Sequence, residues 1–560
     1  MKTTFGLACA LSLLTVMNTA TAQSGDYLAA LVATRSSDAA SATSYLANAL
    51  EKDPDERALI RQQMQILTIE GDFDAALPYA QDFLAIDPQD ALAQTIVRIE
   101  AIRRDDWPTA LATLPLAAES RLDAIIEAIT YASVLTGNGQ ADQALIKVEA
   151  GLDAIGFSSL GHYARGLIYA VQGQYEDSAD AFAAFINQDP FQYPRMAQLA
   201  AEAFERSGDL DNAKLVFEAL LTTGARTAGQ AGLARLEEGE AIPDALTPRA
   251  LDIYTELLFV IARLLAEQEQ SRLAYRYAQE IGYLLTPTAS LYPGYTEVIA
   301  SSLLELERYE EAERFYADLE QVEAFRLAAL LGQVKALSDQ RRYDDALTTL
   351  SKAETLLGGT PGINRQRGIL HFRAEQYQQA VEAFSAWRAD VPELGPGAAQ
   401  PLFIQGISHY RLDDFDSMED ALLTSLELDP DDPSVLNFLA YSWVERGLNL
   451  DRGFEMLNRA VELQPDSGAI IDSLGWAYYQ LGQYQEALPH LERAFQLNPW
   501  SWEIAEHLGD VYWHLDRRRE AEYFWNRALD LPEIPQDHVD AIVTKLSDGL
   551  PKAADASAGQ

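Results

Sequence analysis

The stretch SGAIIDSLGWAYYQLGQYQEALPHLERAFQLNPW, from Ser467 to Trp500, decides the fold of this chain. Its apolar residues recur with helical spacing, and Gly475 and Ala487 are small at points where two antiparallel helices must approach closely. Pro499 ends the second helix, because proline lacks an N–H and clashes with the preceding turn. One such helical hairpin cannot bury its apolar face alone, so the stretch predicts that similar hairpins flank it.

Similar units recur along the chain with a period close to that of this stretch. We expect hairpins to begin at residues 23, 57, 91, 125, 159, 194, 255, 293, 327, 361, 399, 434, 468 and 502. The twentieth residue is alanine in eleven of these fourteen units, namely Ala42, Ala76, Ala110, Ala144, Ala213, Ala274, Ala312, Ala346, Ala380, Ala487 and Ala521. The pattern contains no strand-like alternation. It therefore predicts an all-α solenoid in which each hairpin contacts its neighbours.

The spacing of Leu474-Gly475, Tyr478, Ala487 and Pro499 resembles the tetratricopeptide repeat (TPR) family. The resemblance covers nearly the whole chain after its first 22 residues. It implies a right-handed superhelix of about fourteen helix-turn-helix repeats, with the first helix of each repeat lining a concave face.

The composition limits the partners of the general surface. The chain has 560 residues, 42 Lys and Arg against 85 Asp and Glu, and a formal net charge of −43. This balance argues against binding to nucleic acid or to anionic lipid, because both require basic patches. It is compatible with basic or neutral protein partners, although the acidic residues could also serve only to keep a large surface soluble.

The first 22 residues have the features of a cleavable signal peptide. Lys2 is followed by an apolar stretch from Phe5 to Met17 and by the cleavage motif Ala20-Thr21-Ala22. We expect cleavage after Ala22 and a location in the periplasm. The single cysteine, Cys9, leaves with this segment, so no disulfide is expected in the mature chain. No later apolar run is long enough to span a membrane.

The repeat period is interrupted once, which suggests two repeat blocks. We expect an N-terminal block at 23–224, an irregular linker or degenerate repeat at 225–250, and a C-terminal block at 251–533. The stretch 225–250 is rich in glycine and proline and is read as a loop with one short helix. A capping helix and a disordered tail are expected at 534–560.

Catalytic and cofactor motifs are absent from the sequence, which has no nucleophile elbow, phosphate-binding loop or dinucleotide fingerprint. Two acid–histidine pairs, Glu503 with His507 and Asp510 with His514, could suggest a metal site on one helix. Such i, i+4 pairs are more often surface electrostatics. We therefore expect no enzyme activity, no cofactor and no metal.

A binding groove is the remaining functional feature. The TPR resemblance implies that positions 2, 5, 9, 12 and 13 of each first helix face it. The candidate residues are Phe403, Tyr410, Phe438, Asp472, Trp476, Tyr479, Glu506, Asp510 and Trp513. Aromatic residues in such a groove dominate binding energy, or else they pack between repeats, as we expect for Trp525. Position 9 is expected at Ile407, Ser442, Trp476 and Asp510, so the family's asparagine-based clamp for a terminal carboxylate is absent.

The C-terminal units, from Asp472 to Trp525, resemble a narrower group of proteins. These are LbcA-like TPR adaptors of bacterial envelopes, which dock carboxyl-terminal processing proteases and their cell-wall hydrolase substrates. The resemblance implies a soluble periplasmic adaptor with those protein partners. The alternative is a structural assembly factor for outer-membrane or cell-surface polymer machinery.

Overall fold

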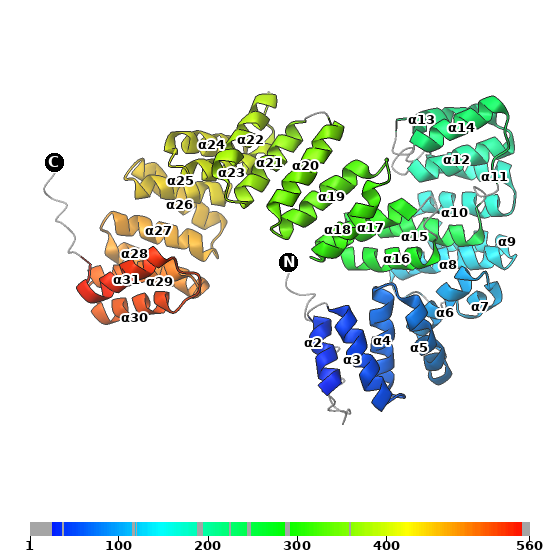
Figure 1. The fold of residues 1–560 in the computed structure, drawn as a ribbon, viewed down its shortest axis with the longest axis horizontal. Helices are drawn as coiled ribbons and strands as arrows, with labels where there is room; N and C mark the ends of the chain where they lie inside the picture. The colour runs from blue at the N-terminus through cyan, green and yellow to red at the C-terminus, as the bar shows by residue number, and fades with distance from the viewer. Residues whose placement is uncertain are drawn as a thin grey trace. The chain divides into compact units, whose positions relative to one another are not determined.

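The structure is a computed structural model that describes residues 25–35, 38–114, 118, 120–186, 194–222, 226–243, 248–285, 292–357, 360–391 and 393–550 (Figure 1). Within these residues every regular element is helical and no strand is present. The predicted all-α class is therefore confirmed. The predicted signal peptide at 1–22, with its cleavage site after Ala22, and the tail from residue 551 onward lie outside the described residues.

The first nineteen α-helices and one π-helix extend to residue 357. They are α2 (Gly25–Arg35), α3 (Ala39–Lys52), α4 (Arg57–Ile69), α5 (Phe73–Ile86), α6 (Ala91–Arg103), α7 (Trp107–Ala112), α8 (Arg121–Gly137), α9 (Ala141–Val148), η2 (Glu149–Asp153), α10 (Ser158–Val171), α11 (Tyr175–Ile186), α12 (Pro194–Ser207), α13 (Leu210–Leu220), α14 (Arg226–Glu238), α15 (Ala250–Glu267), α16 (Ser271–Leu284), α17 (Tyr292–Glu305), α18 (Tyr309–Glu320), α19 (Arg326–Asp339) and α20 (Tyr343–Leu357).

Eleven further α-helices follow. They are α21 (Pro361–Arg373), α22 (Tyr377–Asp390), α23 (Ala399–Tyr410) after the short η4 (Pro396–Ala398), α24 (Phe415–Leu428), α25 (Pro433–Glu445), α26 (Leu450–Leu463), α27 (Gly468–Gln480), α28 (Tyr484–Leu497), α29 (Trp502–His514), α30 (Arg518–Leu529) and α31 (Gln536–Asp548). In chain order the described helices pair into the fourteen predicted hairpins, and α14 and α31 are left over. We call the two members of a hairpin its first and second helix.

Small residues allow the two helices of a hairpin to approach each other. In the hairpin of α27 and α28, a Cβ atom at Gly475 would lie 2.7 Å from Leu491 Cγ, and Ala487 is fully buried. In the next hairpin, a Cβ atom at Gly509 would lie 2.4 Å from the ring of Trp525, which is also fully buried. The predicted packing roles of Gly475, Ala487 and Trp525 are confirmed.

Helix ends follow from the local sequence. The Ser467 side chain accepts a hydrogen bond from the backbone N–H of Ile470 and so caps the start of α27. Gly482 follows α27 with a φ of 73°, a left-handed conformation that glycine adopts without strain. Pro499 comes two residues after α28 ends at Leu497, as predicted.

The irregular stretch at 225–250 contains one helix, α14, which belongs to none of the fourteen hairpins. Gly229 and Gly232 are buried on the side of α14 that faces α13. A Cβ atom at Gly232 would lie 2.3 Å from the Phe217 ring, so the two helices are in direct contact. The glycines that suggested a loop therefore serve close helix packing instead.

The chain forms two compact units, 1–353 and 354–560, and the boundary falls inside α20. This division differs from the predicted repeat blocks, whose boundary is the interruption at 225–250. The reason is that α15 and α16, which follow the interruption, pack against helices of the preceding hairpins. Within unit 1, α15 contacts α8 and α10, and α16 contacts α4 and α6 (Figure 1).

Buried polar contacts fasten α15 to these earlier helices. The Ser133 hydroxyl on α8 donates to the backbone oxygen of Ala250 at 2.7 Å. The buried carboxylate of Glu256 accepts from the Tyr163 hydroxyl at 3.1 Å and from Arg195 Nε at 2.9 Å. Because α4, α6, α8 and α10 are all first helices, α15 and α16 pack against four first helices of unit 1.

None of the described helices is both long and apolar enough to cross a membrane.

Candidate protein-binding face of the second unit

The nine residues predicted to line a groove all lie on first helices of unit 2. Phe403 and Tyr410 are on α23, Phe438 is on α25, Asp472, Trp476 and Tyr479 are on α27, and Glu506, Asp510 and Trp513 are on α29. We call the surface formed by α23, α25, α27 and α29 the first-helix face of unit 2. The structure separates the nine residues into three groups with different surroundings.

Phe403, Tyr410 and Phe438 form the first group, an aromatic cluster between α23 and α25. Phe438 meets the other two rings edge-on, at centroid distances of 5.9 Å from Phe403 and 5.3 Å from Tyr410. All three side chains are half-buried and pack against the apolar core formed around α25 and α26. The Tyr410 hydroxyl donates to Glu445 at 3.3 Å. The cluster thus joins two hairpins and places a polar group at its edge.

Trp476 is the centre of the second group. Its ring lies 4.4 Å from Tyr479 and 3.9 Å from His507, with interplanar angles of 12° and 17°. Two nearly parallel rings this close cannot share one face of the indole, so Tyr479 and His507 cover opposite faces. Trp476 is therefore a half-buried ring that offers its edge, rather than an open face, to a partner.

Further rings extend this stack towards the turn between α27 and α28. Tyr479 lies 5.3 Å from Tyr484 and 5.5 Å from His514, and the last two rings stack on each other at 4.5 Å. Burial lowers the pKa of His514, and the nearby Arg518 lowers it further. The imidazole of His514 is therefore neutral at pH 7 and adds an aromatic ring without charge at this end of the stack.

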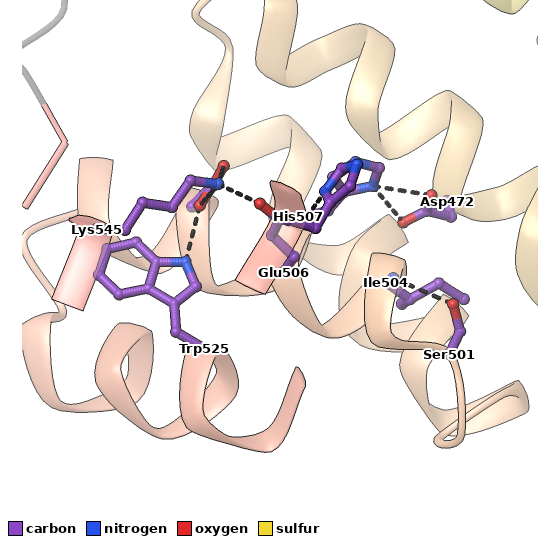
Figure 2. A network of polar contacts seen from close by, with 9 residues as sticks. Asp472, Ser501, Ile504, Glu506, His507, Trp525 and Lys545 are labelled. Carbon is purple, nitrogen blue, oxygen red and sulfur yellow. Dashed lines mark hydrogen bonds and ion pairs between the residues drawn. The ribbon is translucent and has the colours of Figure 1, made fainter. Parts of the chain in front are cut away.

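Asp472 and His507 form an ionic contact between α27 and α29 (Figure 2). His507 Nδ1 lies 3.1 Å from Oδ1 and 3.0 Å from Oδ2 of Asp472, and the two side chains are only 12% and 10% exposed. Burial acts to lower the pKa of His507, but Asp472, aided by Asp510 and Glu503, raises it above its ordinary value. The contact therefore favours the charged imidazole.

Glu506 in the third group faces Lys545 of the terminal helix α31 (Figure 2). Asp510 pairs with the same lysine. Lys545 Nζ lies 2.7 Å from a carboxylate oxygen of each. Trp525 Nε1 donates to Asp510 at 2.8 Å, and His538 Nδ1 lies 3.0 Å from Glu506. Both carboxylates are buried and have partners inside the molecule, so they hold α31 in place and are not open to a partner protein.

Trp513, also in the third group, contacts the backbone just after α31. Its Nε1 donates to the backbone oxygen of Leu550 at 3.0 Å, and its ring lies 5.3 Å from that of Trp525. The guanidinium carbon of Arg518 lies 3.7 Å from the ring centroid of Trp513. Trp513 thus anchors the terminal segment.

Tyr441 on α25 belongs to the first-helix face but is absent from the predicted groove. It is the ninth residue of α25, as Trp476 is the ninth residue of α27. The sequence pattern predicts that this unit begins at residue 434, whereas α25 begins at Pro433. The predicted register therefore assigns Ser442 to the ninth position. That assignment is wrong, because Ser442 is buried in the core and Tyr441 is the half-buried residue of the face.

The cause of the shift is the turn between α25 and α26. The second helix begins 17 residues after the first in this hairpin, at 450 after 433, but 16 residues after it in the next hairpin, at 484 after 468. The extra residue is accommodated by positive φ at both Gly447 and Asn449. The Gly-Leu-Asn turn in the sequence is a signal from which this insertion could be recognised.

Apart from its histidines, the charged side chains of the first-helix face are all acidic. Helices α23, α25, α27 and α29 contain no lysine or arginine. Their acidic residues are Glu445, Asp472, Glu503, Glu506 and Asp510. Among these, Glu445 and Glu503 are exposed and take part in no ion pair within the described part of unit 2. The face therefore combines aromatic rings with two available carboxylates.

The two acid–histidine pairs considered as metal ligands engage other residues. His507 contacts Asp472 on the preceding hairpin, and Asp510 contacts Lys545. Over the described ranges, no group of three or more His, Cys, Asp and Glu side chains is arranged to hold a metal ion.

Comparison with known sequences identifies the repeats. Family models described as tetratricopeptide repeat match residues 365–433 and 473–501, both in unit 2. A TPR repeat-containing protein of Pseudomonas aeruginosa is 29% identical over 167 residues, which is 30% of this chain and 28% of that protein. The BBSome complex member BBS4 of Bos taurus is 34% identical over 86 residues, which is 15% of this chain and 16% of that protein. The chain spans less than a third of the length of these relatives.

Solved structures include similar helical arrays. The crystal structure of the APC/C hetero-tetramer Cut9-Hcn1 aligns with 98% of this chain and 99% of its own, at 15% identity and a TM-score of 0.37. The matched repeats and the fourteen hairpins describe an all-α tetratricopeptide solenoid, a fold whose members bind other proteins.

Proposed function

We propose that this protein is a non-enzymatic scaffold that binds other proteins through the first-helix face of unit 2. The observation that carries the proposal is the contrast between the two units. In unit 1 the first helices α4, α6, α8 and α10 are packed against α15 and α16. In unit 2 the described part of the chain places such a cover only at α29, where α31 packs. On α23, α25 and α27 the described residues place no such cover, so this side is open to a partner.

The finer role that we propose is that of a periplasmic adaptor. The predicted signal peptide at 1–22 supports export, and the resemblance of the C-terminal repeats to envelope adaptors supports a role in delivering substrates to a carboxyl-terminal processing protease. The matched repeat protein of Pseudomonas aeruginosa is consistent with a bacterial setting. In this role the chain needs no catalytic residue, because the protease supplies the chemistry and the scaffold supplies proximity.

The test compares variants of the tagged full-length protein in crosslinked envelope fractions. We expect the unchanged protein to recover a processing protease or a cell-wall hydrolase, and Trp476→Ala with Tyr479→Ala to lose both. The matched control is Trp500→Ala with Tyr523→Ala, whose rings are 71% and 63% exposed and lie outside the first helices. Deleting the gene should make the hydrolase accumulate. Recovery of the same partners by the Trp476 and Tyr479 variant would contradict the proposed face.

A structural subunit of a larger assembly is the second candidate function. The match to a BBSome complex member, a protein named for its place in a complex, favours this alternative. It corresponds to the expected assembly factor for outer-membrane or cell-surface polymer machinery. The gene deletion separates the two candidates, because loss of an assembly subunit should deplete the assembled machinery without accumulation of protease substrates.

A further inference from the structure

The surroundings of Tyr441 indicate a more specific ligand for the first-helix face. Tyr441 is half-buried on α25. Burial raises the pKa of Tyr441, and the carboxylates of Glu445, Asp472 and Glu503 around it raise the pKa further. These three acids come from α25, α27 and α29, so three successive first helices contribute negative charge to one aromatic ring. We call Asn437, Tyr441, Glu445, Asp472 and Glu503 the Tyr441 patch.

The carboxylates of this patch differ in what they already bind. Asp472 is engaged by His507 at 3.0 Å. Glu445 and Glu503 are exposed, and the contact made by Glu445 is a hydrogen bond of 3.3 Å accepted from the Tyr410 hydroxyl. Two carboxylates beside Tyr441 therefore keep most of their hydrogen-bonding capacity for a donor from outside.

Asn437 provides a second, independent observation. It lies one helical turn before Tyr441 and is the fifth residue of α25, the position that Asp472 occupies in α27. The side-chain oxygen of Asp472 receives a contact from His507, but Asn437 Oδ1 is buried without a hydrogen-bond partner in the described structure. A buried acceptor without a donor is costly, so a partner towards which the Asn437 amide turned and which donated to it would gain a stabilising hydrogen bond.

The groups that the patch offers are acceptors and a π surface. Carboxylate oxygens and an aromatic ring suit a cation with several N–H donors and no acceptor. Arginine meets this requirement better than lysine, because its planar guanidinium stacks on aromatic faces and donates in pairs to carboxylates. The absence of lysine and arginine from α23, α25, α27 and α29 means that no basic side chain on these helices competes for the patch.

We infer that the Tyr441 patch binds an arginine side chain of an extended, basic segment in the partner protein. The inference rests on the proposed binding role of the first-helix face and names the partner chemistry. The guanidinium would lie on Tyr441 and donate to Glu445 and Glu503. Further basic residues of the segment would follow the face towards Tyr410, whose hydroxyl already contacts Glu445.

Fluorescence anisotropy with the full-length protein tests the inference directly. The probes are three labelled peptides of equal length in which serine alternates with arginine, lysine or glutamate. We expect the arginine peptide to bind, the lysine peptide to bind several-fold more weakly, and the glutamate peptide not to bind. Glu445→Gln with Glu503→Gln should weaken the arginine peptide by about tenfold or more, since two charge-assisted contacts are lost.

The control removes the same charge from the second helices. Glu455 on α26 and Glu486 on α28 are exposed and have no ion pair within the described residues. Glu455→Gln with Glu486→Gln should leave the affinity within about twofold, because exposed charges at a distance are largely screened by salt. Tyr441→Phe should retain binding and Tyr441→Leu should lose it, since phenylalanine keeps the π surface.

Two results would overturn the inference. One is an equal loss of affinity in both glutamate pairs, which would show that only overall charge matters. The other is absence of binding by the arginine peptide while the native partner is still captured through Trp476 and Tyr479. That result would support the scaffold function and refute the arginine site. If the unchanged protein captures no native partner but still binds the arginine peptide, the result counts against the proposed function alone.

Discussion

His507 of α29 lies 3.0 Å from the carboxylate of Asp472 on α27 and thereby joins the first helices of two adjacent hairpins. The same His507 ring stacks on Trp476, so one imidazole connects the buried ionic contact to the aromatic stack. This pair gives the first-helix face a measurable dependence on pH.

We expect the stability contributed by His507 to decrease as the pH rises. The pKa of His507 in the folded chain is raised above its ordinary value of 6.5. The contribution is therefore fully present below pH 6.5 and is lost as the pH rises through the higher, folded-state pKa. The measurement is the midpoint of thermal unfolding of the unchanged protein and of His507→Gln across this range. A difference between the two that grows with pH would contradict the assignment.

Lys545→Met should destabilise unit 2, because it leaves the buried carboxylates of Glu506 and Asp510 without their shared cation. Removing one partner of such a buried group costs about 3 kcal/mol. Urea unfolding followed by circular dichroism measures the loss. The control is Lys335→Met, where both Lys335 and its partner Glu305 are about half exposed and the expected change is below about 1 kcal/mol. Equal effects of the two substitutions would show that Lys545 is not a structural cation.

Gly509→Ala should destabilise the hairpin of α29 and α30. The added Cβ would lie 2.4 Å from the fully buried Trp525 ring, which has no room to move away. Overpacking of this kind costs about 1–3 kcal/mol, which outweighs the helix propensity gained by alanine. In the control, Gly395→Ala, no atom lies within 4 Å of the new Cβ. Denaturant midpoints that coincide for the two variants would contradict the close approach.

Trp476→Ala and Trp513→Ala should have separable effects. We expect Trp476→Ala to abolish partner capture with an unchanged helical circular dichroism signal, because its neighbours Tyr479 and His507 remain on their helices. Trp513→Ala should instead release the backbone at Leu550 and increase amide exchange in α31, since the indole hydrogen bond is lost. If Trp476→Ala unfolds unit 2, Trp476 is a packing residue and the face is misassigned.

Glu256→Gln tests whether α15 is fastened to the earlier hairpins of unit 1. It removes the counter-charge of Arg195 at a buried site, at a cost of about 3 kcal/mol. Amide exchange in α15 and α16 should therefore accelerate. The control on the same helix is Glu267→Gln, whose side chain is 53% exposed and pairs with Arg263 at 3.6 Å, so exchange should not change.

Features that depend on neighbours in the chain were predictable from the sequence. The helical class, the fourteen hairpins and the packing roles of Gly475, Ala487 and Trp525 all follow from residues within one repeat, because a hairpin is a local structure with a fixed period. The same holds for the predicted aromatic and acidic residues of the first helices. All nine do lie on α23, α25, α27 and α29.

Tertiary structure alone decided which of those residues are available. Glu506, Asp510 and Trp513 contact α31 and the segment after it, and Asp472 contacts His507. These partners lie in other repeats, and helical periodicity does not specify which side chains meet between repeats. The packing of α15 on α8 and α10, and of α16 on α4 and α6, likewise joins helices that are far apart in the sequence. Such contacts between distant repeats are three-dimensional, and a one-dimensional period cannot represent them.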